Sequence, residues 1–97
     1  MQLFNKPEIE RFIVKHAATR NALRRWVDVV EEAVWKNHND LKQTFPSADY
    51  VGNARYVFNI KENEYRIVAV VVFIAGTLTV RFVGTHEEYD RIDCKTI

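Results

Sequence analysis

The sequence contains few of the residues that cross-link a fold or interrupt it locally. Cys94 is the only cysteine, so an internal disulfide is excluded, and a reducing cytoplasmic location is expected rather than secretion. The chain has only 3 glycines, whose scatter excludes a phosphate-binding glycine loop: Gly52, Gly76 and Gly84. His16 and His38 have no partner at the spacing of metal ligands, so we expect no metal site and no cofactor.

The chain also lacks a segment that would place it in a membrane. The longest apolar run, 67–75, is too short to span a bilayer as a helix, so we expect no membrane partner. The first residues carry several charges, unlike a signal peptide: Lys6, Glu8, Glu10, Arg11 and Lys15. A net charge of +1 gives no general attraction to nucleic acid, so any anion site must be a local cluster.

What the sequence does contain is a stretch, 55–82, dominated by β-branched and aromatic residues. It divides into three runs: 55–60, 65–74 and 77–82. Turn-forming residues separate the runs, which predicts an antiparallel meander of three strands, with a fourth left open. A tip at Glu62-Asn63, or a four-residue loop over 61–64, places Asn59 opposite Arg66 and Arg55 opposite Val70. A two-residue loop at Ala75-Gly76 places Val70 opposite Arg81 and Arg66 opposite Thr85.

Alternation of strand side chains sorts these residues onto two faces. One face is apolar and must be covered: Tyr56, Phe58, Ile60, Tyr65, Ile67, Ala69, Val71, Phe73, Leu78, Val80 and Phe82. The other face mixes valines with polar residues: Arg55, Asn59, Arg66, Arg81 and Thr85, beside Val57, Val68, Val70, Val72 and Val83. A bulge or a three-residue second turn would move Arg81 to the apolar face.

Helical patterns flank the meander. Asn5-Lys6-Pro7-Glu8 predicts the start of a first helix, and a second opens at Thr19 or Asn21. The second helix has apolar positions spaced three and four apart: Leu23, Trp26, Val27, Val30, Ala33 and Val34. Thr85 and Glu88 have the spacing of a capping box, which predicts a short helix after the last strand. We therefore expect one α+β domain, 1–97, with two N-terminal helices packed on the meander and a short C-terminal helix.

Several segments, in this order and at these spacings, resemble the HigB-type toxins of bacterial toxin–antitoxin modules, a branch of the RelE/ParE superfamily. The segments are Trp35-Lys36-Asn37, Asp40-Leu41-Lys42, Phe45-Pro46-Ser47-Ala48-Asp49, Arg55–Ile60, Asn63–Ala69 and Gly84-Thr85-His86-Glu87-Glu88-Tyr89-Asp90. The resemblance covers nearly the whole chain and rests on the ordered set rather than on one motif.

This resemblance implies a RelE-like mRNA endonuclease, an mRNA interferase that cuts translated messages on the ribosome and so inhibits translation. It implies metal-independent cleavage, in which the ribose 2′-hydroxyl attacks the neighbouring phosphate and leaves a cyclic phosphate end. It also implies neutralisation by a DNA-binding helix-turn-helix antitoxin of the HigA type. A heterotetramer that binds operator DNA is one form of that complex.

Such chemistry needs a cation beside the phosphate, a proton acceptor and a proton donor. We assign Arg66 to the phosphate and the transition-state charge, and His86 to general acid or base duty, because imidazole titrates near neutral pH. Tyr89 would orient or stack on a base, or take the other proton role. Four residues would bind RNA backbone or base edges: Arg55, Asn59, Lys61 and Arg81.

Simpler interpretations stand beside these. Arg66 could pair with Glu64 or Glu88 on the surface, and His86 could be a polar first-turn residue. The fold could also serve a non-catalytic toxin that binds a protein target such as gyrase. A small RNA-binding module is a further alternative, but it needs aromatic residues on the arginine face, where the predicted register places none.

Overall fold

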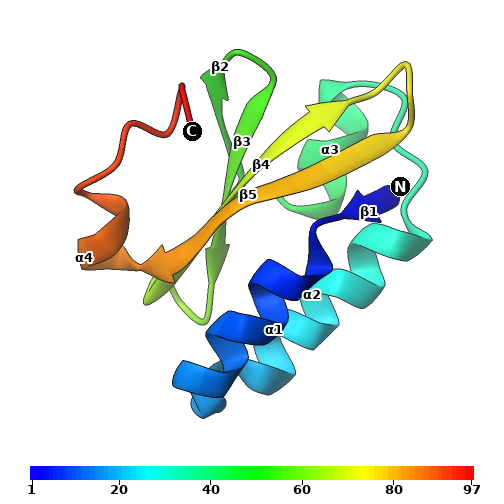
Figure 1. Cartoon of the computed structure of the whole chain (residues 1–97). Coiled ribbons are helices and arrows are strands. Elements are labelled where there is room, and N and C mark those ends of the chain that lie inside the picture. Colours follow the sequence, from blue (N-terminus) through cyan, green and yellow to red (C-terminus); the bar gives the residue numbers. More distant parts are fainter.

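The predicted meander forms the centre of a larger sheet. The structure, a computed structural model, describes residues 1–97 and contains a five-stranded sheet in the order β1-β5-β4-β3-β2 (Figure 1). Its central strands are the predicted ones: β3 (Arg55–Ile60), β4 (Tyr65–Val72) and β5 (Thr77–Thr85). The α+β class expected from the sequence is confirmed.

Two short strands extend the sheet at its edges. Strand β2 (Asp49–Gly52) pairs antiparallel with β3, and β1 (Gln2–Phe4) pairs parallel with β5. Strand β1 was not predicted because three residues are too few to show an alternating pattern. Its parallel pairing makes the sheet mixed.

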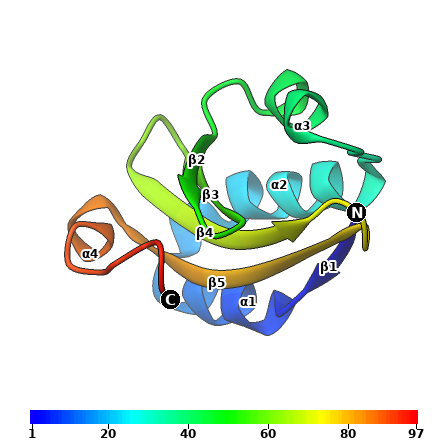
Figure 2. The same cartoon turned by 90° about the horizontal axis from the view of Figure 1, so that it is seen from above.

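Most of the helices are formed by the N-terminal half of the sequence. Helix α1 (Lys6–Lys15), the 3₁₀ turn η1 (Ala17–Thr19) and α2 (Arg20–Glu32) come first, and α1 and α2 run side by side (Figures 1 and 2). A shorter α3 (His38–Thr44) follows, and α4 (His86–Tyr89) directly continues β5. Asn5 precedes α1 but does not cap it, because its side-chain amide donates to the Val80 carbonyl oxygen at 2.8 Å.

One apolar core joins the helices to one face of the sheet. From the helices it contains Ile9, Phe12, Ile13, Leu23, Trp26 and Val30, and from the strands Tyr56, Phe58, Ile60, Ile67, Ala69, Val71, Leu78, Val80 and Val83. Trp26 packs edge-on against Phe58 with ring centroids 5.3 Å apart. Burial of this surface stabilises the fold by roughly 25 cal/mol per Å². Most of the predicted helical stripe and most of the predicted apolar sheet face are therefore confirmed. Val34 is an exception, because it lies beyond the end of α2 and is 79% exposed.

The first hairpin has the predicted register. Asn59 lies opposite Arg66, and Arg55 lies opposite Val70. The connection is the four-residue alternative, 61–64, in which Glu64 N–H donates to the Lys61 carbonyl oxygen at 3.2 Å. Lys61, Glu62 and Asn63 all have positive φ angles, an unusual run for residues other than glycine.

The second hairpin differs from the prediction. Val72 pairs with Thr77 across a four-residue loop, 73–76, so Val70 lies opposite Thr79 rather than Arg81. A shift of two residues keeps every side chain on its predicted face, which is why Leu78 and Val80 are in the core.

A bulge then reverses the faces at the end of β5. Ala69 pairs with Val80 but Val68 pairs with Phe82, which leaves Arg81 without a partner on β4. Val83 consequently enters the core, and Phe82 moves to the opposite face, so the predicted faces of both were wrong. The predicted pairing of Arg66 with Thr85 is also corrected, because Arg66 lies opposite Gly84.

Candidate active site

Arg66 projects from the sheet face that is turned away from α1 and α2. Its neighbour Ile67 belongs to the core cluster, and successive side chains on a strand point to opposite faces. Across the sheet, Arg66 lies between Asn59 on β3 and Gly84 on β5. Phe82 shares this face, and its ring lies over Gly84: a Cβ atom placed on Gly84 would be 2.3 Å from Phe82 Cζ.

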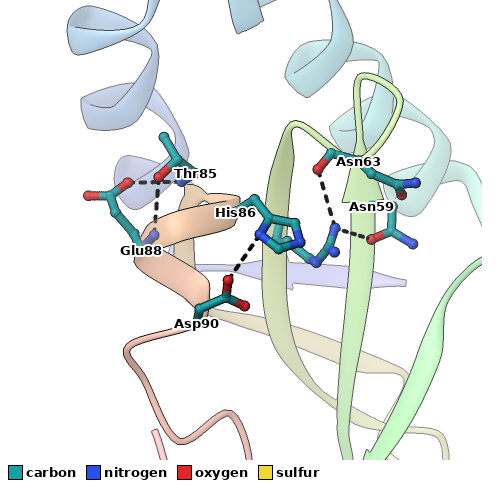
Figure 3. A network of polar contacts seen from close by, with 7 residues as sticks. Asn59, Asn63, Thr85, His86, Glu88 and Asp90 are labelled. Atoms are coloured by element: carbon teal, nitrogen blue, oxygen red, sulfur yellow. Dashed lines mark hydrogen bonds and ion pairs between the residues drawn. The ribbon is translucent and has the colours of Figure 1, made fainter.

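Protein contacts hold the guanidinium group of Arg66 in place. Its Nη1 donates to Asn59 Oδ1 at 2.7 Å and to the Asn63 carbonyl oxygen at 3.4 Å (Figure 3). The guanidinium carbon lies 5.4 Å from the centre of the Tyr89 ring, a cation–π contact. Nε and Nη2 make no hydrogen bond within the protein, so both remain available to a phosphate oxygen.

Tyr89 is partly buried beside Arg66. Its hydroxyl donates to Cys94 Sγ at 3.5 Å. Burial, followed by the contact with Cys94, raises the pKa of Tyr89 to about 12, although the nearby Arg66 acts in the opposite direction. Its phenol therefore stays protonated at neutral pH and can act as a hydrogen-bond donor.

His86 is the first residue of α4. Its Nδ1 lies 3.1 Å from Asp90 Oδ2, one helical turn further on, and its side chain is 52% exposed (Figure 3). Nε2 makes no hydrogen bond or ion pair within the protein, so this nitrogen is open to a ligand.

Local hydrogen bonds fix α4 at the end of the sheet. Thr85 Oγ1 accepts from the backbone N–H of Glu88, and the Glu88 carboxylate accepts from the backbone N–H of Thr85, which confirms the predicted capping box (Figure 3). The backbone N–H of His86 donates to the Glu64 carbonyl oxygen at 3.1 Å. The structure thus brings Arg66 and Tyr89 into contact and ties the start of α4 to the hairpin that carries Arg66.

The residues predicted to bind RNA are in different situations. Asn59 orients Arg66 through Oδ1, and its Nδ2 donates to the Ser47 carbonyl oxygen at 3.2 Å. Lys61 and Arg81 are exposed, and their side chains make no hydrogen bond or ion pair within the protein, so both charges are free. Arg55 is occupied, because its Nε and Nη2 both donate to the Ile97 carbonyl oxygen, at 3.1 and 2.8 Å.

Sequence reasoning missed three features of this face. Asn63 supports Arg66 through a backbone carbonyl, which no side-chain pattern reveals. Asp90 lies four residues after His86, a helical spacing that could have pointed to their contact. The segment after α4 returns to the sheet, where Asn53 Nδ2 donates to the Lys95 carbonyl oxygen at 3.1 Å, a contact between residues 42 positions apart.

A second cluster of histidine and tyrosine lies at the other end of β3, on the core side of the sheet. His38 Nδ1 lies 2.7 Å from the hydroxyl of Tyr56, and burial raises the pKa of Tyr56. The two residues line a cavity of about 580 Å³ together with Lys36, Asn37, Tyr50, Ala54, Val71 and Phe73. Neither Arg66 nor Tyr89 lines this cavity, which therefore lies apart from the predicted site.

Comparison with known proteins assigns the family. The sequence profile of the HigB toxin family, described as the RelE-like toxic component of a toxin–antitoxin system, matches residues 19–92. The chain belongs to the HigB toxin family. It is 32% identical over 93 residues to the mRNA interferase toxin HigB of Escherichia coli K12, covering 93% of this chain and 88% of the relative. The mRNA interferase HigB of Shigella flexneri is similar to the same extent. That of Escherichia coli O6:H1 is 24% identical over 94 residues, covering 95% and 91% of the two chains.

Membership of the HigB family makes this chain the toxic component of a toxin–antitoxin system, so an antitoxin is its expected protein partner. The matched range contains Arg66, His86 and Tyr89. None of the helices combines the length and the apolar character needed to cross a bilayer.

Proposed function

We propose that this HigB-family toxin is an endoribonuclease that cuts messenger RNA during translation on the ribosome, by attack of the ribose 2′-hydroxyl and without a metal ion. The relatives named above are called mRNA interferases, which supports the substrate. The observation that carries the proposal is the oriented guanidinium of Arg66, held by Asn59 and Asn63 and in contact with the Tyr89 ring.

Arg66 would stabilise the charge on the phosphate. Negative charge grows on the non-bridging oxygens as the 2′-oxygen attacks, and fixed donors aimed at that charge lower the barrier. Because only Nη1 is engaged by the protein, Nε and Nη2 form a free pair of donors that matches two phosphate oxygens.

His86 and Tyr89 would handle protons and position the nucleotide. The open Nε2 of His86 serves as general acid or base. Tyr89 stays protonated, so its ring can stack on a base, and its hydroxyl can donate a hydrogen bond to RNA in place of the one to Cys94 Sγ. Phe82 adds an aromatic ring to the same face, which suits unstacked RNA bases.

The remaining predicted residues would bind the RNA strand. Lys61 and Arg81 carry free, exposed charges that can contact backbone phosphates. Asn59 is already engaged with Arg66, so its contribution would come through that side chain. Arg55 would contribute only if the 93–97 segment released its guanidinium.

We infer that the protein partner is a helix-turn-helix antitoxin of the HigA type. The family description supports an antitoxin, and the resemblance supports its DNA-binding character and a heterotetramer that binds operator DNA. A protein that acts on translated messages and on such a partner would work in the cytoplasm. Purification of the complex, followed by measurement of its mass and of its binding to the promoter region, tests this inference.

One experiment separates the candidate functions. The toxin is induced without antitoxin, and the 5′ ends of cellular messages are mapped for the wild type and for the Arg66→Ala and His86→Ala variants. Cuts phased with codons that disappear in the variants support the proposal. Growth arrest with intact messages and damaged DNA would instead indicate a gyrase-type target, and absence of a growth effect would indicate an RNA-binding module.

A further inference from the structure

His86 and Asp90 stand at the two ends of α4 and meet across one helical turn. The Nδ1 atom of His86 lies 3.1 Å from Asp90 Oδ2 (Figure 3). The backbone N–H of Asp90 donates to the His86 carbonyl oxygen, also at 3.1 Å, and the capping box holds the other end of the same turn. The two side chains are 52% and 59% exposed, so they are accessible to RNA.

Asp90 is the acidic residue of this turn that is directed at the imidazole. The carboxylate of Glu88 is engaged at the helix start, where it accepts from the backbone N–H of Thr85 at 2.8 Å. Glu87 is exposed and makes no hydrogen bond or ion pair. The i, i+4 spacing places Asp90, rather than either glutamate, on the side of the helix that carries His86.

We propose that Asp90 is a positioning residue that fixes the tautomer of His86 and thereby makes His86 the general base of the reaction. An ionised carboxylate only accepts hydrogen bonds, so it favours the imidazole that carries its proton on Nδ1. The other nitrogen, Nε2, is then bare and has a lone pair free to accept a proton. This inference rests on the proposed endoribonuclease function and selects the base role from the two that the sequence left open.

In this arrangement every proton that moves during the reaction has a donor and an acceptor. His86 Nε2 takes the proton of the ribose 2′-hydroxyl as the 2′-oxygen forms its bond to phosphorus. The bond from phosphorus to the 5′-oxygen breaks with its electron pair on that oxygen, which takes a proton from solvent water. The imidazolium then returns its proton to the hydroxide left in solvent, and a 2′,3′-cyclic phosphate and a 5′-hydroxyl remain. Asp90 stays ionised throughout and never touches the substrate.

The tautomer is tested without reference to activity. Ring ¹⁵N shifts and two-bond ¹H–¹⁵N correlations of His86 are measured at pH values raised until the shifts no longer change, so that the neutral ring is observed. The wild type should show the proton mainly on Nδ1. Asp90→Ala should remove this preference, and Asp90→Glu should retain it. Glu87→Gln removes a charge from the same turn and should leave the spectrum unchanged. A wild-type proton located mainly on Nε2 would overturn the proposal.

Kinetics test whether Asp90 acts through His86. Single-turnover cleavage of a defined message in a translating extract should be slowed about 100-fold or more by His86→Ala, in line with general base catalysis. Asp90→Ala should slow it about 10-fold, with recovery in Asp90→Glu and no change in Glu87→Gln. In the His86→Ala background, Asp90→Ala should add nothing, because the two act as one unit.

These outcomes distinguish a failure of the inference about Asp90 from a failure of the proposed endoribonuclease function. If Asp90→Ala slowed cleavage by the same factor in the wild type and in the His86→Ala variant, Asp90 would act independently of His86. The endoribonuclease function would still stand as long as the wild type cleaves messages and Arg66→Ala does not. A wild type that does not cleave would defeat the function, and the tautomer measurement would still decide whether Asp90 orients His86.

Discussion

The two ends of strand β3 each bring a histidine close to a tyrosine, yet their chemistry differs. At one end, His38 Nδ1 and the Tyr56 hydroxyl are 2.7 Å apart, and Tyr56 is only 2% exposed. At the other end, His86 and Tyr89 are each bonded to another residue, and both flank the end of the sheet where Arg66 projects. His38 and Tyr56 are hydrogen-bond partners of each other. At the Arg66 end, His86 Nε2 and two guanidinium nitrogens of Arg66 have no hydrogen-bond partner in the protein.

The comparison shows that residue type alone does not make a site. The His38 end has a large and mostly apolar cavity, which is the usual mark of a small-molecule site. At the Arg66 end, none of the described pockets contains Arg66, and the neighbouring His86 is 52% exposed, an arrangement that leaves room for a long polyanion such as RNA. The two ends differ in how their cation is held. Lys36 lines the cavity at the His38 end, whereas hydrogen bonds to Asn59 and Asn63 orient the guanidinium group of Arg66.

Removal of one cation at each end tests this comparison most directly. Arg66→Ala should lower the rate of message cleavage about 100- to 1,000-fold, because an oriented donor to the transition-state charge is lost. Lys36→Ala removes the same charge at the His38 end and should leave cleavage unchanged. Cleavage rates in a translating extract, with circular dichroism as a check of folding, measure both. Equal rates for wild type and Arg66→Ala would remove the distinction between the two ends.

A smaller effect is expected from the residue that aims Arg66. Asn59→Ala removes the 2.7 Å acceptor of Nη1 and should slow cleavage about 10-fold through misalignment of the guanidinium. Asn53→Ala is the matched control, because the only hydrogen bond of the Asn53 side chain is the one that Nδ2 donates to the Lys95 carbonyl oxygen. If Asn59 acts through Arg66, its substitution should have no effect in an Arg66→Ala background, and additive losses would show an independent contact with RNA.

At the His38 end, we expect a substitution to lower the stability of the fold and to leave its activity unchanged. Tyr56→Phe deletes a hydroxyl that lies 2.7 Å from His38 Nδ1, and the net loss should be about 1 kcal/mol in the free energy of unfolding. Message cleavage should not change. Urea unfolding monitored by fluorescence gives the first quantity. A Tyr56→Phe variant with wild-type stability and impaired cleavage would show that this end has a part in function.

The sequence was sufficient for α1, α2, α4, the three central strands and the first hairpin, because strand alternation and helix spacing are local signals, but it did not identify the short edge strands β1 and β2. It placed Arg66 opposite Asn59 correctly, since both candidate loops gave the same pairing. It failed at Phe82 and Val83, because a single-residue bulge reverses the faces and leaves no local mark in composition.

The site was predictable only in part for a similar reason. Arg66 and Tyr89 were named from the strand pattern and the closing motif, and the structure brings them into contact. The anchoring of Arg55 by the Ile97 carbonyl oxygen joins residues 42 positions apart, and no pattern in the sequence encodes that return of the chain.

The mildest prediction concerns alkaline pH and again contrasts the two tyrosines. The pKa of Tyr89 in the folded chain is about 12, above its ordinary value of 10.0, and the pKa of Tyr56 is shifted in the same direction. A raised folded-state pKa contributes stability that is fully present below pH 10 and is lost as the pH rises towards about 12. Tyr89→Phe should therefore flatten the fall in unfolding free energy over this range, and Tyr56→Phe should do so to a smaller extent. Urea titrations at a series of pH values measure how steeply the unfolding free energy falls in each variant. The double variant with both substitutions should show the smallest fall. A Tyr89→Phe protein that loses stability as steeply as the wild type would show that the phenol beside Arg66 is not shielded from solvent, so that it would ionise as readily as a free tyrosine.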